Sequence, residues 1–276
     1  MENEISPLQK YKRQPKLYID LPSQGRWNSQ DAKSTEVAVY SMTAGDEISL
    51  KTPDSLYSGL ATVNLIKSCL PEIKDPWLLP SVDVDYILSA IRLASYGDSL
   101  GISAPCSSCS EVNEYSLDVQ KILDHYTSVK YQDQVRVDDF IFDLRPLYYK
   151  EANALQKESF YTQRILIQQV QQMPENDEKQ DMLNELYEKL NTMTKETIMT
   201  AVYKITTPEG ETETQHQFIR NFLENNEGKF FKEIRKVFEN NNKLFAVPDF
   251  EVECGSCGSN FKITPTMDYA SFFAEG

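Results

Sequence analysis

Histidine is scarce in this 276-residue chain, which contains only His125 and His216. The chain also lacks a glycine-rich phosphate loop, a G-x-S-x-G sequence and an H-E-x-x-H sequence. Neither histidine lies near a reactive motif, so we expect both to be solvated or interfacial. We interpret the acidic pairs Asp83/Asp85 and Asp138/Asp139 as cap and turn residues. These absences predict a protein that is not an enzyme and has no small-molecule substrate.

Basic residues are outnumbered, with 28 Lys and Arg against 42 Asp and Glu and a net charge of −14. Such a chain repels nucleic-acid phosphates and anionic lipid. Its one basic cluster is short, lies near the N-terminus beside Pro7 and Pro15, and is expected to form an arm (Lys10, Lys12, Arg13, Lys16). No apolar run is long enough for a transmembrane helix. We therefore predict neither a nucleic-acid nor a membrane partner.

Four of the five cysteines form two widely separated Cys-x-x-Cys pairs, Cys106/Cys109 and Cys254/Cys257. A Cys-x-x-Cys turn directs two sulfurs at one metal ion, and two such turns complete a tetrahedral site of four thiolates. We predict one Zn²⁺ bound by all four. Four thiolates leave no open position for chemistry, so the zinc would be structural. Cys69 is interpreted as an ordinary core residue.

Two disulfides, redox-active dithiols and free thiols are the alternatives to zinc. The polar N-terminus carries no secretory signal, which predicts a reducing cytosol where metal binding is favoured over disulfides. A thioredoxin-like pair would begin a helix. Here strand-like sequences follow instead, residues 114–119 and 261–265. The zinc would pin both ends of the intervening chain, so its loss should loosen residues 110–250 and leave 1–100 folded.

The first hundred residues are expected to form a small α/β unit. Residues 1–28 look extended, and 36–42 have the pattern of a strand. Thr43 can cap a short helical turn, and Thr52-Pro53-Asp54 predicts the start of a helix that ends at Pro71. Ser81 or Asp83 can cap a further helix that stops at Gly97. Four residues of the N-terminal segment are expected to contact a partner or this unit's own core (Leu17, Tyr18, Ile19, Trp27).

The remainder alternates between β and helical character. Alternating apolar residues predict a hairpin around Asp138-Asp139. Long helices are expected over 148–173 and 176–205, and two shorter ones within 217–242, on either side of Gly228. We therefore predict an α+β fold: a zinc-ribbon-like β platform interrupted by a helical insert. The expected regions are 1–100 (α/β unit), 101–147 (first half of the ribbon), 148–243 (helical insert) and 244–276 (second half and tail).

Five short elements in residues 18–109 occur in an order typical of one family. They are LPSQGRW, MTAGDE, LKTPD, the segment IKSCLPEIKDPW and the helix AIRLASYG, and they precede PCSSC. This third of the chain resembles the T4-like bacteriophage baseplate protein family, the hub-assembly proteins of contractile-tailed phages. In the rest of the chain, only the second cysteine pair shares in the resemblance.

The resemblance implies a non-enzymatic structural or assembly role in the central baseplate hub. Its implied partners are other phage baseplate and tail proteins or further copies of itself. It implies synthesis in the host cytoplasm and leaves two fates open, residence in the virion tail baseplate or release as a chaperone. The main alternative is a zinc-ribbon nucleic-acid-binding regulator, which the acidic charge disfavours. A metal-dependent enzyme would need an open coordination position.

Overall fold

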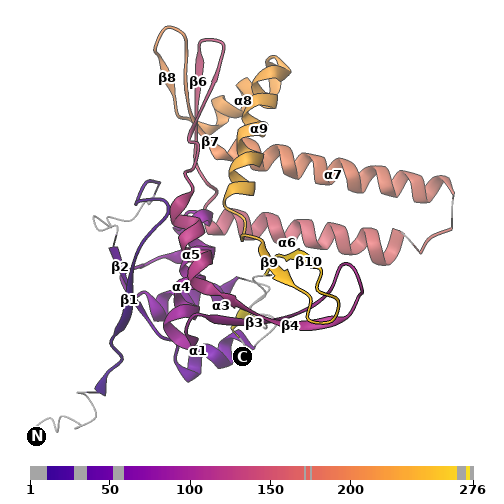
Figure 1. Ribbon diagram of the computed structural model, residues 1–276. Coiled ribbons are helices and arrows are strands. Elements are labelled where there is room, and N and C mark those ends of the chain that lie inside the picture. The colour runs from indigo at the N-terminus through magenta and orange to yellow at the C-terminus, as the bar shows by residue number, and fades with distance from the viewer. Residues whose placement is uncertain are drawn as a thin grey trace, which may run out of the picture. The chain divides into compact units, whose positions relative to one another are not determined.

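The computed structural model describes residues 11–27, 36–51, 59–170, 172–174, 176–265 and 272–273 (Figure 1). The chain divides into two units. Unit 1 comprises residues 1–76, 83–128 and 247–276, and unit 2 comprises 77–82 and 129–246. Helices and strands occur in both units, so the α+β prediction is confirmed.

The described residues of unit 1 form three two-stranded antiparallel sheets and several helices, of which α3 contacts β2 of the first sheet. Its elements are β1 (Pro15–Asp20), β2 (Glu36–Tyr40), α1 (Ala44–Leu50), α3 (Leu60–Cys69), most of α4 (Ser81–Tyr96), β3 (Ser99–Pro105), β4 (Val112–Asp118), α5 (Val119–Ser128), β9 (Phe250–Glu253) and β10 (Asn260–Ile263). Sheet pairing joins β1 to β2, β3 to β4 and β9 to β10. The last two pairs are hairpins, and each carries one Cys-x-x-Cys turn.

Most of the predicted elements of unit 1 are confirmed, including the strand at 36–40 and the stop of α4 before Gly97, whose φ is +84°. The predicted helix start at Thr52-Pro53-Asp54 lies outside the described residues. The N-terminal strand β1 was expected to contact either a partner or the core of its own unit. Its side chains point alternately toward the core and toward solvent, so both remain open for different residues. Ile19 is buried in the unit's own core, whereas Tyr18 is 61% exposed.

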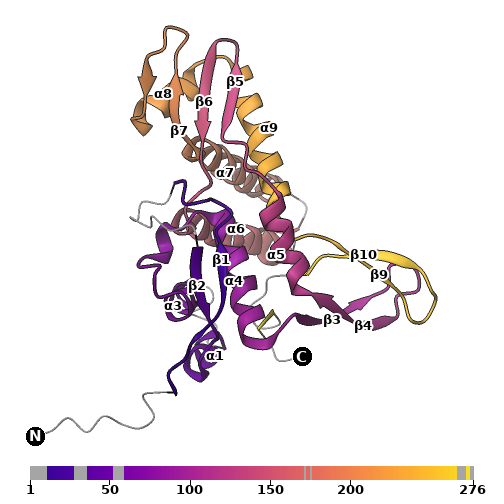
Figure 2. The same ribbon diagram turned by 60° about the vertical axis from the view of Figure 1, so that its left-hand side comes forward.

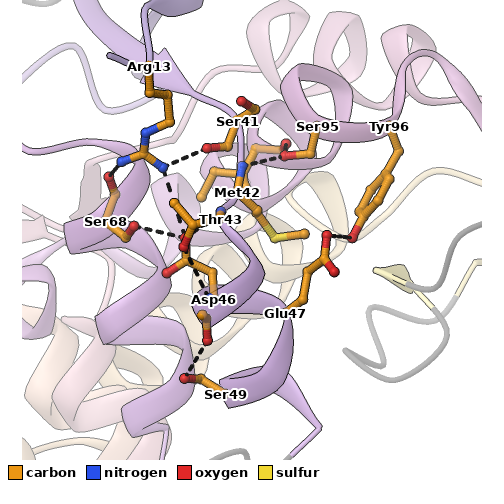
Figure 3. A network of polar contacts seen from close by, with 12 residues as sticks. Arg13, Ser41, Met42, Thr43, Asp46, Glu47, Ser49, Ser68, Ser95 and Tyr96 are labelled. Carbon is orange, nitrogen blue, oxygen red and sulfur yellow. Dashed lines mark hydrogen bonds and ion pairs between the residues drawn. The ribbon is translucent and has the colours of Figure 1, made fainter. Parts of the chain in front are cut away.

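A polar network joins the N-terminal arm to three helices of unit 1 (Figure 3). Thr43 caps α1 as expected and forms a capping box with Asp46, and the Ser68 hydroxyl donates to Asp46 Oδ2 at 2.9 Å. Arg13 donates to the carbonyl oxygens of Ser41 and Ser68. The MTAGDE element also contacts the AIRLASYG helix. Met42 N–H donates to Ser95 Oγ, and the Tyr96 hydroxyl donates to Glu47 at 3.0 Å. These two elements therefore have a structural role, which is to hold α1 and α4 together.

Replacing Asp46 by alanine is expected to destabilise unit 1 by roughly 2–3 kcal/mol, because Thr43 N–H, the Ser68 hydroxyl and Arg13 lose their shared acceptor. Ser49→Ala is the matched control, since that exposed hydroxyl bonds only its own helix at Gly45. Hydrogen exchange of residues 36–50 and the thermal midpoint would measure both. Equal effects of the two variants would show that the network adds no stability.

Unit 2 is built on a four-stranded antiparallel sheet of order β5-β6-β7-β8. Its elements are β5 (Gln134–Val137), β6 (Phe140–Leu144), α6 (Tyr149–Ile165), a π-helical turn (Leu166–Val170), α7 (Asp177–Ala201), β7 (Val202–Thr206), β8 (Thr212–Glu213), α8 (His216–Asn225) and α9 (Gly228–Leu244). Figure 1 shows α6 and α7 as an antiparallel pair. The segment 77–82 joins this unit through backbone bonds, Tyr149 N–H to Leu79 and Ser81 N–H to Leu147.

The predicted hairpin at Asp138-Asp139 is confirmed, and Asp138 adopts a left-handed φ of +51° in its turn. The prediction of continuous helix to Ile205 is wrong. Residues 202–206 form β7, which pairs with β6 in the register Phe142↔Ile205. Val202 and Ile205 are buried there, and β-branched side chains suit a pleated, buried surface. The segment expected to be a helical insert thus contributes two strands to a sheet.

Candidate metal centre

The two Cys-x-x-Cys turns have the same backbone geometry. Cys106 N–H donates to Glu111 O at 2.8 Å, and Ser110 N–H donates to Cys106 O at 2.9 Å. The second turn repeats this pattern, with Cys254 N–H to Ser259 O at 3.0 Å and Gly258 N–H to Cys254 O at 2.9 Å. Each turn needs a left-handed residue directly after its second cysteine. That residue is Ser110 in one turn, with φ +61°, and Gly258 in the other, with φ +69°.

The turns bring all four predicted sulfur ligands together within unit 1. Their Sγ atoms lie within 4.8 Å of one another. Cys106 Sγ is 3.8 Å from Cys257 Sγ, and Cys109 Sγ is 3.8 Å from Cys254 Sγ. Figures 1 and 2 both show the two hairpins side by side with their turns converging. Residues 145 to 151 positions apart in the chain therefore meet at one point.

These separations fit a tetrahedral metal site. Zinc–sulfur bonds of about 2.3 Å in tetrahedral geometry place neighbouring sulfurs about 3.8 Å apart. A disulfide requires sulfurs about 2.05 Å apart, and all four cysteines are free thiols. The donor set therefore suits a thiophilic ion such as zinc, with two ligands from each hairpin.

Donors around two of the four sulfurs, those of Cys106 and Cys254, stabilise the thiolate form that a metal requires, whereas the neighbouring thiols raise the pKa of Cys109 and Cys257. Backbone N–H groups of Cys257 and Ser256 lower the pKa of Cys254 to about 6. Backbone N–H groups of Cys109 and Ser108 likewise lower the pKa of Cys106. The Asn113 side chain donates to Cys254 Sγ at 3.4 Å. Cys106 and Cys254 are also the buried member of each pair, while Cys109 and Cys257 are exposed.

Contacts between the hairpins hold the turns in register, and no pattern in the sequence indicated any of them. The Ser108 and Ser259 hydroxyls are 2.8 Å apart across the two turns. Tyr115 and Phe261 pack edge to face with ring centroids 5.9 Å apart. Asn113 reaches the opposite turn, where it lies against Gly255 as well as Cys254. Asn113 lies near the first Cys-x-x-Cys turn in the sequence, but the groups that it contacts belong to the second turn.

Cys69 stands apart from this group, as predicted. It is fully buried in α3, and burial raises the pKa of its thiol to about 12. Such a thiol stays protonated and unreactive. Neither histidine belongs to the cluster of four thiols. His125 is half-buried on α5 of unit 1, and His216 is exposed at the start of α8 in unit 2.

Asp83 differs from its predicted role as a helix cap. Its side chain is 0% exposed, and its Oδ1 accepts the Ser23 N–H at 2.8 Å, which ties the LPSQGRW element to α4. Burial raises the pKa of Asp83 to about 7, against the opposing effect of the Ser23 hydrogen bonds. Burial also raises the pKa of Asp85 to about 6. Asp83 therefore has a structural role, which is to hold Ser23 against α4.

Replacing Asp83 by asparagine is expected to stabilise the protein at pH 8 by roughly 1–3 kcal/mol and to have little effect at pH 4. The folded-state pKa lies above the unfolded value, so ionisation costs stability as pH rises from about 4 through 7. Asparagine keeps the acceptor for Ser23 and cannot ionise. Thermal midpoints at both pH values would measure the gain. Exposed Asp98→Asn is the control, and an equal pH dependence in wild type and Asp83→Asn would contradict the assignment.

Comparisons with known proteins give one match. The family described as "T4 bacteriophage base plate protein" matches residues 20–274, which is most of the chain and includes both cysteine pairs. No curated protein and no solved structure matches the chain. In the described part of the chain, no helix has the length and hydropathy that a membrane crossing requires.

Proposed function

The chain belongs to the family of the T4 bacteriophage base plate protein, and from this premise we propose that it is a structural or assembly component of the baseplate hub. It is a phage baseplate protein, and membership of that family implies contacts with other tail proteins. The hub position and the assembly role are the proposed refinements. The family match over residues 20–274 is the observation that supports the baseplate role. The hub position and the assembly role rest on the resemblance of the five short elements in residues 18–109.

We propose that the four cysteines hold one structural zinc ion. The proposal is supported by four sulfurs within 4.8 Å of one another at the ends of two hairpins. Four thiolates fill a tetrahedral shell, so the ion would have no position left for substrate or water. When bound, it would cross-link the two hairpins as a zinc ribbon. The role proposed for the centre is therefore mechanical, and no catalytic role or small-molecule substrate is proposed.

Nucleic-acid binding by the ribbon is the alternative, and the charge on the hairpins opposes it. The segments 99–118 and 249–263 carry six exposed carboxylates and a single exposed basic residue, Lys262 (Glu111, Glu114, Asp118, Asp249, Glu251, Glu253). A phosphate backbone would be repelled by this surface. Duplex DNA binding at low salt that weakens as salt rises would favour the alternative.

We propose that the protein acts in the host cytoplasm during assembly and reaches the tail baseplate through contacts with other tail proteins. The test is an infection in which the wild-type chain is replaced by Cys254→Ser with Cys257→Ser. Incomplete baseplates are expected with this variant, and complete ones with Cys69→Ser, whose thiol lies outside the centre. Imaging purified tails with subunit assignment would show whether the chain remains in the virion. Normal infectious tails from the double variant would contradict the structural role of the centre.

A further inference from the structure

The helices α6 and α7 form an antiparallel pair, which we call the helical arm, and few of its apolar side chains are buried. Within α6 the buried residues are Asn153 and Thr162, both polar. In the first seventeen residues of α7, residues 177–193, only Leu186 is buried. Lys189 Nζ of α7 forms an ion pair with Glu158 of α6 at 3.4 Å. An arm with so little apolar burial presents most of its helical surface for contact with another molecule.

One face of α6 is basic and aromatic. Lys150, Lys157 and Arg164 recur every seven residues and so lie on one face of the helix. Phe160 and Tyr161 fall between Lys157 and Arg164 on the same face, and they are 51% and 54% exposed. In a chain of net charge −14, a helix face bearing three cations and two large aromatic rings is unusual. Arg and aromatic side chains are enriched in the centres of protein interfaces.

One face of α7 has the opposite charge. Four carboxylates recur at spacings of three and four residues, and all four are exposed (Glu178, Asp181, Glu185, Glu188). No ion pair is present for any of these four, or for Lys150 and Lys157, among the residues that the structure describes. The arm therefore carries two complementary charged faces on separate helices.

We propose that the basic face of α6 binds the acidic face of α7 of a second copy of this chain. The charges match along both helices, and Phe160 and Tyr161 would supply apolar contact area at the centre. Opposite charges across a helix–helix contact also fix its register and exclude wrong partners. This interface involves only α6 and α7, so it depends neither on the metal centre nor on the proposed role in the hub.

Sedimentation velocity of the full chain over a range of concentrations tests the interface. Association that weakens at high salt is expected, because screening reduces the attraction between exposed charges. Lys157→Glu with Arg164→Glu should weaken association about tenfold or more, and so should Glu185→Lys with Glu188→Lys. An equimolar mixture of these two variants should associate again, since the reversed faces are complementary. Phe160→Ala with Tyr161→Ala should weaken association without changing its salt dependence.

The matched control is Lys232→Glu with Lys236→Glu, which makes the same charge change on exposed positions of α9. It should associate like the wild type, and circular dichroism should show all variants folded. A wild-type chain that stays monomeric at every concentration would overturn the proposal. So would association that survives both reversals, or a mixture that fails to associate. If the wild-type chain is monomeric and Lys157→Glu with Arg164→Glu is the only reversal that blocks tail assembly, the basic face of α6 instead binds an acidic surface on another tail protein.

Discussion

Cys254→Ser combined with Cys257→Ser is expected to remove the bound metal and to unfold both hairpins locally, at residues 99–118 and 250–263. The remaining two thiolates come from one turn and cannot hold the hairpins together. Structural zinc contributes roughly 10 kcal/mol or more to folding in small zinc modules, because the ligands converge only in the folded chain. Hydrogen exchange resolved by segment would show the loss of protection, and elemental analysis would show the loss of metal.

The structure changes where this effect should appear. From the sequence, the metal was expected to pin the ends of the insert, so its loss would loosen residues 110–250. Both cysteine pairs lie in unit 1, whereas residues 129–246 form unit 2 with its own sheet and core. We therefore expect α6 to α9 to keep their protection in the double variant. Cys69→Ser should leave both metal content and exchange unchanged, and a double variant with wild-type exchange in both hairpins would refute the cross-linking role.

Phe142→Ala is expected to destabilise unit 2 by roughly 3–5 kcal/mol, the range for removing a large buried aromatic side chain. Phe142 is fully buried on β6, and its ring lies 5.7 Å from Phe230 and 6.3 Å from both Phe140 and Phe222. The substitution leaves a cavity where β6, α8 and α9 meet and removes the aromatic contacts among them.

Phe218→Ala provides the comparison, because that ring on α8 is 54% exposed and its loss should change stability by less than about 0.5 kcal/mol. Denaturant unfolding followed by exchange of the β6 and β7 amides would separate unit 2 from unit 1. Similar effects from the two substitutions would mean that Phe142 is not the centre of this core.

Local signals in the sequence predicted local structure well. The Cys-x-x-Cys spacing determines the turn that orients two sulfurs, and the presence of a second pair indicated a shared site of four. The Thr43 cap could be predicted because a capping side chain reaches only three residues along the chain, here to the Asp46 N–H. Gly97 ends α4 because its left-handed φ favours glycine.

Apart from the cluster of four sulfurs, the features that depend on distant partners were not predicted. The β-branched segment at 202–206 directly follows a long helix, and its strand conformation depends on pairing with β6, about sixty residues earlier. Asp83 looked like a cap because its partner, Ser23, lies sixty positions away. Asn113 and Ser259 support the sulfur cluster only because the two hairpins meet. Sequence periodicity carries no information about such pairings.

Metal content measured together with the thiol state tests the central claim most directly. Elemental analysis of the chain purified without chelator, with mass spectrometry of the alkylated cysteines, is expected to give about one zinc per chain and four metal-protected thiols. Acidification should release the ion, because protons compete with zinc for the thiolates of Cys106 and Cys254. A chain that contains no metal and two intramolecular disulfides, Cys106–Cys109 and Cys254–Cys257, would contradict the account.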